Sequence, residues 1–340
     1  MTWFRLFGRR SAVRGMSAAV SLILILFVLI QTGSPVLGTT VPVSPTAESK
    51  SGEAPDASGE VAEQLPPPDL PTTSKQGYTF DLQASLKADL KKVATDAPVY
   101  ALDRGAMTKA QAQKLADKLK IGAKVKARGT DGFTASGEGE LFITPDLIQY
   151  QSASGPKDGK LPSDEEAVTA ARKWLRGSGL TPADLGEGHV ASRVEPSHVV
   201  VVVFAPIEPD GLLAAYPSIT VSLGPKGEVL EAAKRWADIQ PADTYQLRSA
   251  EDAWKDVQVG EVYIEANLTE ADFPAGADVS GSVTYNDISI GYTTAGPPGG
   301  TQYLEPVFVF KGRLRIEGKK GTYAIKAYLP ALANSGAPVG

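Results

Sequence analysis

The chain has 340 residues, of which 42% are apolar and 21% charged, with a formal net charge of -5 and no cysteine. This length suffices for one large domain or for roughly two to three small ones. The missing cysteines exclude disulfides, thiolate nucleophiles and cysteine-bound zinc. The acidic balance argues against a nucleic-acid binder, which needs a concentrated basic surface.

The N-terminal 38 residues have the order of an export segment. Four arginines come first: Arg5, Arg9, Arg10 and Arg14. The apolar run MSAAVSLILILFVLI follows at residues 16–30, and the next charge is Glu48. Positive charge before an apolar core indicates a cytoplasmic N-terminus. Residues 1–38 are therefore predicted to be either an uncleaved single-pass anchor or a signal peptide cleaved after Gly38. Both alternatives place the remaining chain outside the cytoplasmic membrane, at the cell membrane or secreted.

Residues 39–76 are rich in Pro, Ser, Thr, Ala and Glu and end in QLPPPDLPTTSKQ. Such a composition cannot bury enough apolar area to offset its own chain entropy. The segment is predicted to be a disordered tether that holds a folded body, beginning at residue 77, away from the bilayer.

Three segments of this body open like helices: TKAQAQKLADKL from Thr108, SDEEAVTAARKWL from Ser163 and SAEDAWKDV from Ser249. Each first residue has a hydroxyl that can accept a hydrogen bond from the first helical turn. Gln111 and Glu166 stand three residues after their caps and predict capping boxes. Asp252 is too short for that reach but suits the positive end of a helix.

Period-two alternation of apolar residues follows each helix and predicts strands. The segments are ELFITPDLIQYQSA, then HVVVVVFAP and SITVSLGPKGEVLEAAKRW, and finally GEVYIEANL, SVTYNDISIGY, TQYLEPVFVFKGRLRI and GTYAIKAYLPAL. Most strands follow one another without a helix between them, which favours antiparallel sheets in an α+β fold. We predict three tandem units, each an antiparallel sheet covered by one capped helix: residues 77–160, 161–245 and the strand-rich 246–332, followed by a flexible tail at 333–340. The alternative is one mixed domain in which three capped helices occur by chance.

No catalytic, cofactor-binding or metal-binding residue is predicted. His189 and His198 have no further zinc ligands near them in the sequence and are interpreted as surface or strand-end residues. The string SGPK at residues 154–157 matches S-x-x-K, but its Gly and Pro predict a loop rather than the helical turn that this chemistry uses. The acidic residues 164–166 are interpreted as helix-start residues rather than as a glycosidase pair.

Aromatic residues concentrate in the last unit, and most are expected to lie in the core of its sheet. The alternative is an exposed face that docks a partner, because tyrosine combines a large contact area with a polar tip. The candidate partner-binding residues are Tyr285, Tyr292, Tyr303 and Phe308. The loop TTAGPPGGTQ at residues 293–302 is either a simple connection or a recognition loop.

The second unit, LPSDEEAVTAARKWL…ITVSLGPKGEVLEAAKRW, resembles a PepSY-type domain, in which a Ser/Thr-x-x-x-Ala helix continues into a sheet with a valine-rich strand and a glycine turn. The run KGEVLEAAKRWADIQPADTYQLRSAEDAWKDV, with YNDISIGY and YLEPVFVFKG, is similar to YycH-like and YycI-like proteins. These are bacterial membrane-anchored accessory proteins whose extracytoplasmic domains regulate a cell-wall-sensing histidine kinase. The resemblance covers roughly residues 98–329 and brings no catalytic residue with it. The long Pro-rich tether and the final segment depart from the pattern.

We therefore expect a non-enzymatic, membrane-tethered extracytoplasmic binding or regulatory protein without a cofactor. The resemblance implies another envelope protein as the partner, with a sensor kinase or a cell-wall process modulated by protein–protein contact. PepSY-type domains also occur in protease propeptides, so the alternative is an inhibitor or chaperone-like module for an extracellular peptidase. An enzyme of unrecognised type is the third alternative.

Overall fold

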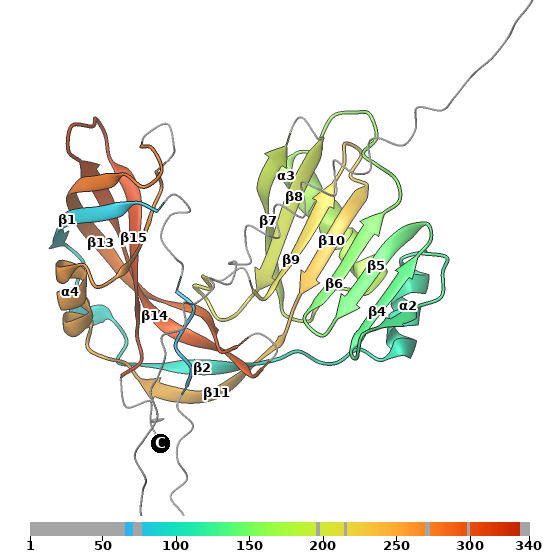
Figure 1. The fold of residues 1–340 in the computed structure, drawn as a ribbon, viewed down its shortest axis with the longest axis horizontal. Coiled ribbons are helices and arrows are strands. Elements are labelled where there is room, and N and C mark those ends of the chain that lie inside the picture. Colours follow the sequence, from blue (N-terminus) through green and yellow to red (C-terminus); the bar gives the residue numbers. More distant parts are fainter. Residues whose placement is uncertain are drawn as a thin grey trace, which may run out of the picture. The chain divides into compact units, whose positions relative to one another are not determined.

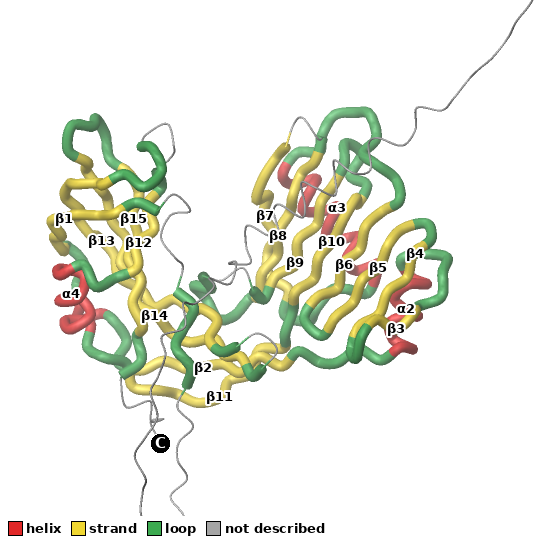
Figure 2. The backbone as a smooth tube through the Cα atoms, in the orientation of Figure 1, coloured by secondary structure: helices red, strands yellow, loops and turns green. Residues whose placement is uncertain are grey.

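The computed structural model describes residues 65–70, 77–194, 198–213, 216–268, 273–297 and 300–333. The predicted export segment at 1–38 lies outside these residues, as do most of the predicted tether and most of the predicted tail. The described fold is α+β, as predicted, and its strands form two separate sheets (Figure 1 and Figure 2).

One continuous stretch of the chain, green to yellow in Figure 1, forms an eight-stranded sheet. Its strands are β3 (Lys126–Arg128), β4 (Gly132–Ser136), β5 (Gly139–Thr144), β6 (Leu147–Ser152), β7 (Leu185–Val194), β8 (Val199–Pro206), β9 (Ser218–Leu223) and β10 (Val229–Arg235). Across the sheet they follow the order β3-β4-β5-β6-β10-β9-β8-β7. The two helices α2 (Lys109–Lys118) and α3 (Asp164–Ser178) share one apolar core with the strands, so they cover the same face of this sheet.

The starts of the helices follow the sequence prediction. Thr108 and Gln111 form a capping box at α2, and Ser163 and Glu166 form one at α3. At α4 (Ala250–Val259) the Asp252 carboxylate bonds the cap hydroxyl and Lys255 instead of the backbone N–H of the cap. The expected short reach of aspartate is thus confirmed. None of the helices in the described ranges is both long and apolar enough to cross a membrane.

A seven-stranded sheet combines the two ends of the described chain. Its strands are β1 (Thr79–Leu86), β2 (Asp96–Asp103), β11 (Asp238–Gln246), β12 (Tyr263–Ala266), β13 (Asp278–Ala295), β14 (Gln302–Ile316) and β15 (Tyr323–Pro330). The main order is β1-β13-β14-β15-β12, and β2 pairs with both β11 and β14. A short 3-10 turn, η1 (Leu90–Lys92), follows β1. Ala253 and Val257 of α4 share the apolar core of this sheet with Phe308 and Phe310.

The pairing of β1 with β13 differs from the prediction of purely antiparallel sheets. These two strands run parallel, in a register that extends from Thr79↔Asp278 to Leu86↔Tyr285. A parallel pair requires a long crossover connection, and here most of the described chain lies between the two strands. No local pattern in β1 signals a partner that is so distant in sequence.

The eight-stranded sheet is inserted between two strands of the other sheet. The chain passes from β2 into the eight-stranded sheet and returns from it into β11. β2 and β11 pair antiparallel, with Asp103 opposite Asp238. Within the insertion, β6 pairs with β10, which brings Tyr150 opposite Ala232. Strands of the predicted units 77–160 and 161–245 thus share a single sheet, and the predicted arrangement of one sheet for each capped helix is not confirmed.

Part of the predicted tether is attached to the body. Pro68 forms a bridge with Ala295 at the end of β13, and the Asp69 N–H donates to the Thr294 carbonyl at 2.7 Å. Leu70 packs on the apolar cluster of Val307, Val309 and Tyr328. These backbone and apolar contacts give residues 65–70 the anchoring that their composition did not predict.

Candidate functional site

Three of the four predicted partner-binding residues belong to the core. Tyr285 is 1% exposed, Phe308 0% and Tyr292 8%, whereas Tyr303 is half-buried. The Tyr285 ring lies 6.0 Å from the rings of both Trp254 and Phe310, measured between centroids. A buried side chain has little surface to offer a partner, so these three residues fit the expectation of sheet core rather than the alternative of a docking face.

Burial also changes the acid–base properties of these tyrosines. It raises the pKa of Tyr285 and, together with the neighbouring Tyr100, raises the pKa of Tyr292 to about 12. The rings of Tyr292 and Tyr100 meet edge to face with centroids 5.4 Å apart. Both hydroxyls are therefore neutral at physiological pH and act as packing groups.

The other residues singled out in the sequence lie apart from one another. His189 is exposed on β7, and His198 is exposed with a positive φ of 51° just before β8. No group of three metal-binding side chains occurs in the ranges that the structure describes. In the first turn of α3, Asp164 pairs with Arg193, and Glu166 accepts the Ser163 N–H at 2.8 Å. That bond lowers the pKa of Glu166.

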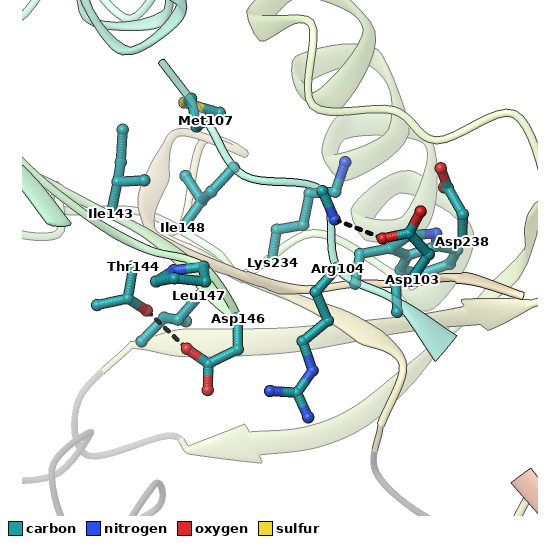
Figure 3. A pocket seen from close by; sticks show the side chains of 14 residues that line it. Asp103, Arg104, Met107, Ile143, Thr144, Asp146, Leu147, Ile148, Lys234 and Asp238 are labelled. Atoms are coloured by element: carbon teal, nitrogen blue, oxygen red, sulfur yellow. Dashed lines mark hydrogen bonds between the residues drawn. The ribbon is translucent and has the colours of Figure 1, made fainter. Parts of the chain in front are cut away.

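A pocket that the sequence did not indicate has a volume of about 190 Å³ (Figure 3). Three segments line it: the link after β2, the β5–β6 hairpin, and the junction between β10 and β11. In Figure 3, Arg104 and Asp146 extend to the same side of the pocket, and Lys234 extends to the other. Charged groups of both signs therefore surround an interior that Ile143 and Ile148 make partly apolar.

Two hydrogen-bond donors of residues that line this pocket are buried without a partner. Arg104 Nη2 donates to Gln302 Oε1, and the guanidinium carbon lies 5.7 Å from the centroid of the Tyr216 ring. Arg104 Nε and Trp236 Nε1 have no hydrogen-bond partner in the described part of the chain. Each such donor costs about 1–3 kcal/mol when it stays unpaired.

The ionisable groups of the pocket have different environments. Burial lowers the pKa of Lys234, while the carboxylates of Asp238 and Asp184 partly oppose that effect. The Asp103 carboxylate accepts the Gly105 N–H at 3.2 Å, and the Asp146 carboxylate accepts the Thr144 hydroxyl at 2.8 Å, as the dashed lines in Figure 3 mark. These two carboxylates hold local turns in place.

No spacing in the sequence links the pocket residues, because they come from three distant segments. Arg104 follows a strand end, while Lys234 and Trp236 close a hairpin. A tryptophan at the end of a strand is typical of a core residue. Only the return of β11 alongside β2 brings Lys234 and Trp236 to the same pocket as Arg104.

The chain matches no protein-family model and no curated protein. Among solved structures, it is similar to an uncharacterized protein from Eubacterium rectale, with 12% identity, a TM-score of 0.36, and coverage of 74% of this chain and 87% of that one. It is also similar to the Bacillus megaterium YpeB C-terminal domain, with 13% identity, a TM-score of 0.33, and coverage of 68% of this chain and 100% of that one. At these TM-scores neither similarity supports an inference about fold or function.

Proposed function

We propose that this chain is a non-enzymatic, membrane-tethered extracytoplasmic protein that binds another envelope protein and thereby modulates a sensor kinase or a cell-wall process. The tandem PepSY-like character of the body is part of this proposal. The order of basic residues, apolar run and Pro-rich segment before the body supports tethering.

The observation that carries the binding function is the set of buried donors without partners around Arg104. These donors are covered in the free protein, so a partner that inserts a carboxylate or amide side chain into the pocket would pair them by displacing the side chains that cover them. The carboxylates of Asp103 and Asp146 hold turns, which supports a binding role over general acid–base chemistry.

Position-specific crosslinking in membranes tests this proposal. The photoreactive residue p-benzoylphenylalanine replaces Asp146, an exposed residue at the pocket, in the full-length chain. A matched chain carries it at Lys320, exposed in the loop between β14 and β15. Protease added to intact cells measures whether the body lies outside the membrane.

We expect a sensor kinase or a wall-synthesis protein crosslinked from position 146 and absent from position 320, with the body accessible to protease. A peptidase crosslinked from position 146 would replace the regulatory function with the inhibitor or chaperone-like alternative. If the two positions give the same products, or if the body is protected from protease, the proposal is wrong.

A further inference from the structure

The strand β7 forms an edge of the eight-stranded sheet. In the part of the chain that the structure describes, β8 pairs with one side of β7 and no strand pairs with the other. Too few residues separate β7 from β8 for a crossover, so the two strands run antiparallel. The Ile207 N–H donates to the Asp184 carbonyl at 2.9 Å, which places these two residues opposite each other. Along its unpaired side, β7 therefore presents backbone N–H and C=O groups of alternate residues that have no partner strand in the described ranges.

A groove of about 750 Å³ runs beside the start of this edge, between β7 and α3. Arg172 and Arg176 of α3 line one side, and Gly186 and Ile207 lie on the sheet side. The groove therefore adjoins backbone groups that can pair with another extended chain.

The charges of the groove favour an acidic occupant. Arg172 Nη2 donates to the Gly186 carbonyl at 2.7 Å, and its guanidinium carbon lies 5.2 Å from the centroid of the Phe204 ring, so this side chain is held in place. Arg176 is exposed and forms no ion pair within the described ranges. Glu187 is the one acidic residue of the lining. The two arginines leave a net positive charge.

An apolar contact lies at the same place. Ile207 is 64% exposed, which is unusual among the large apolar side chains of the described residues. It projects beside the groove that the two arginines line. An extended segment in this groove would meet backbone groups, a cationic side chain and an apolar side chain together.

We infer that β7 and this groove form the docking site for an extended acidic peptide segment of a partner protein, which adds to the sheet as a strand beside β7. The inference rests on the proposed binding function and adds the surface and the chemistry of the partner. Carboxylates of the segment pair with Arg176, and its apolar residues cover Ile207.

Peptide binding to the full-length protein tests the inference. The probe is a fluorescein-labelled synthetic peptide in which glutamate alternates with valine, and the comparison peptide has lysine in place of glutamate. Arg176→Gln removes the free charge of the groove, while Lys173→Gln removes an exposed charge from the same helix outside the groove. Fluorescence anisotropy measures affinity, and hydrogen exchange measures protection of the β7 amides.

We expect the glutamate probe to bind, Arg176→Gln to weaken binding about five-fold or more, and Lys173→Gln to leave it unchanged. The bound probe should slow exchange in residues 185–194, and the lysine probe should not bind. Failure of the glutamate probe to bind, equal affinity of the two variants, or protection elsewhere overturns the inference. If the crosslink from position 146 persists in that case, the proposed function stands without this docking site.

Discussion

At the residue scale, the side chains of two glutamates are more deeply buried than those of the other acidic residues in the described ranges. Glu231 on β10 is 5% exposed and Glu305 on β14 is 1% exposed. One carboxylate oxygen of each has no hydrogen-bond partner in the described structure. Burial raises the pKa of both groups to about 7, from a usual value of 4.5.

These raised pKa values predict how stability depends on pH. Between pH 4.5 and about 7, the folded protein keeps protons on Glu231 and Glu305 that the unfolded chain releases. The free energy of unfolding should therefore fall as the pH rises through this window and level off above it. Glu305→Gln should raise the free energy of unfolding at pH 8 by about 2 kcal/mol and leave it nearly unchanged at pH 5.

Urea unfolding at both pH values measures this effect. Glu317→Gln is the control, because Glu317 is exposed at the end of β14 and should change stability at neither pH. An equal effect of Glu305→Gln at pH 5 and pH 8 would contradict the assignment of a buried, protonated carboxyl group.

A second residue-scale prediction concerns Gly188 on β7. A Cβ at this position would lie 2.4 Å from Cε1 of Phe204, whose ring is fully buried. Gly188→Ala should therefore lower the free energy of unfolding by about 1–3 kcal/mol. Gly177→Ala in α3 meets no atom within 4 Å and should raise it by up to about 1 kcal/mol. Urea denaturation compares the two variants, and similar effects would argue against the clash.

At the element scale, α3 shows how local and tertiary contacts combine. Its capping box sets the start of the helix, and Gly179 in a left-handed conformation with φ of 76° ends it. Ala167 and Ala171 are fully buried, so the backbone of the helix lies close to the sheet. Asp164 also pairs with Arg193, which links the start of α3 to β7.

The cap of α3 gives an element-scale prediction. Ser163→Ala removes the hydroxyl that accepts the Glu166 N–H at 3.3 Å and should lower the free energy of unfolding by about 1 kcal/mol. Ser163→Asn keeps an acceptor and should restore most of the loss. Thermal unfolding followed by circular dichroism measures both variants. A loss with asparagine as large as that with alanine would show that the hydroxyl does not act as a cap.

At the scale of the whole molecule, the two sheets differ in how their strands are distributed along the sequence. The eight-stranded sheet and its two helices come from a single stretch between β2 and β11. The seven-stranded sheet needs segments from both sides of that stretch. Independent folding should therefore be possible for the inserted stretch and impossible for either flank alone.

Fragments of the chain test this prediction. Residues 104–237 contain every strand of the eight-stranded sheet and should fold alone, with dispersed amide signals and resistance to protease. The fragment 77–160 contains β1 without its partner β13 and β6 without its partner β10, so it should remain unfolded. A protease-resistant core in fragment 77–160 would support the predicted tandem units instead.

The features that could be predicted from the sequence are local ones. The capping boxes at Thr108 and Ser163 and the hairpin of β9 and β10 were predictable, because their interactions join residues close together in the chain. The α+β class followed from the same local patterns. The short reach of Asp252 was predictable from its length alone.

Which strands share a sheet and which side chains meet depends on contacts between segments that are far apart in the sequence. No strand was predicted at β1 from the sequence, and period-two alternation would suit any partner strand, so nothing local indicated the pairing with β13. The burial of Tyr285 and Phe308, the pocket at Arg104 and the free edge of β7 all depend on strand order. Strand order is set by contacts between distant segments, whose energies no single stretch of sequence contains.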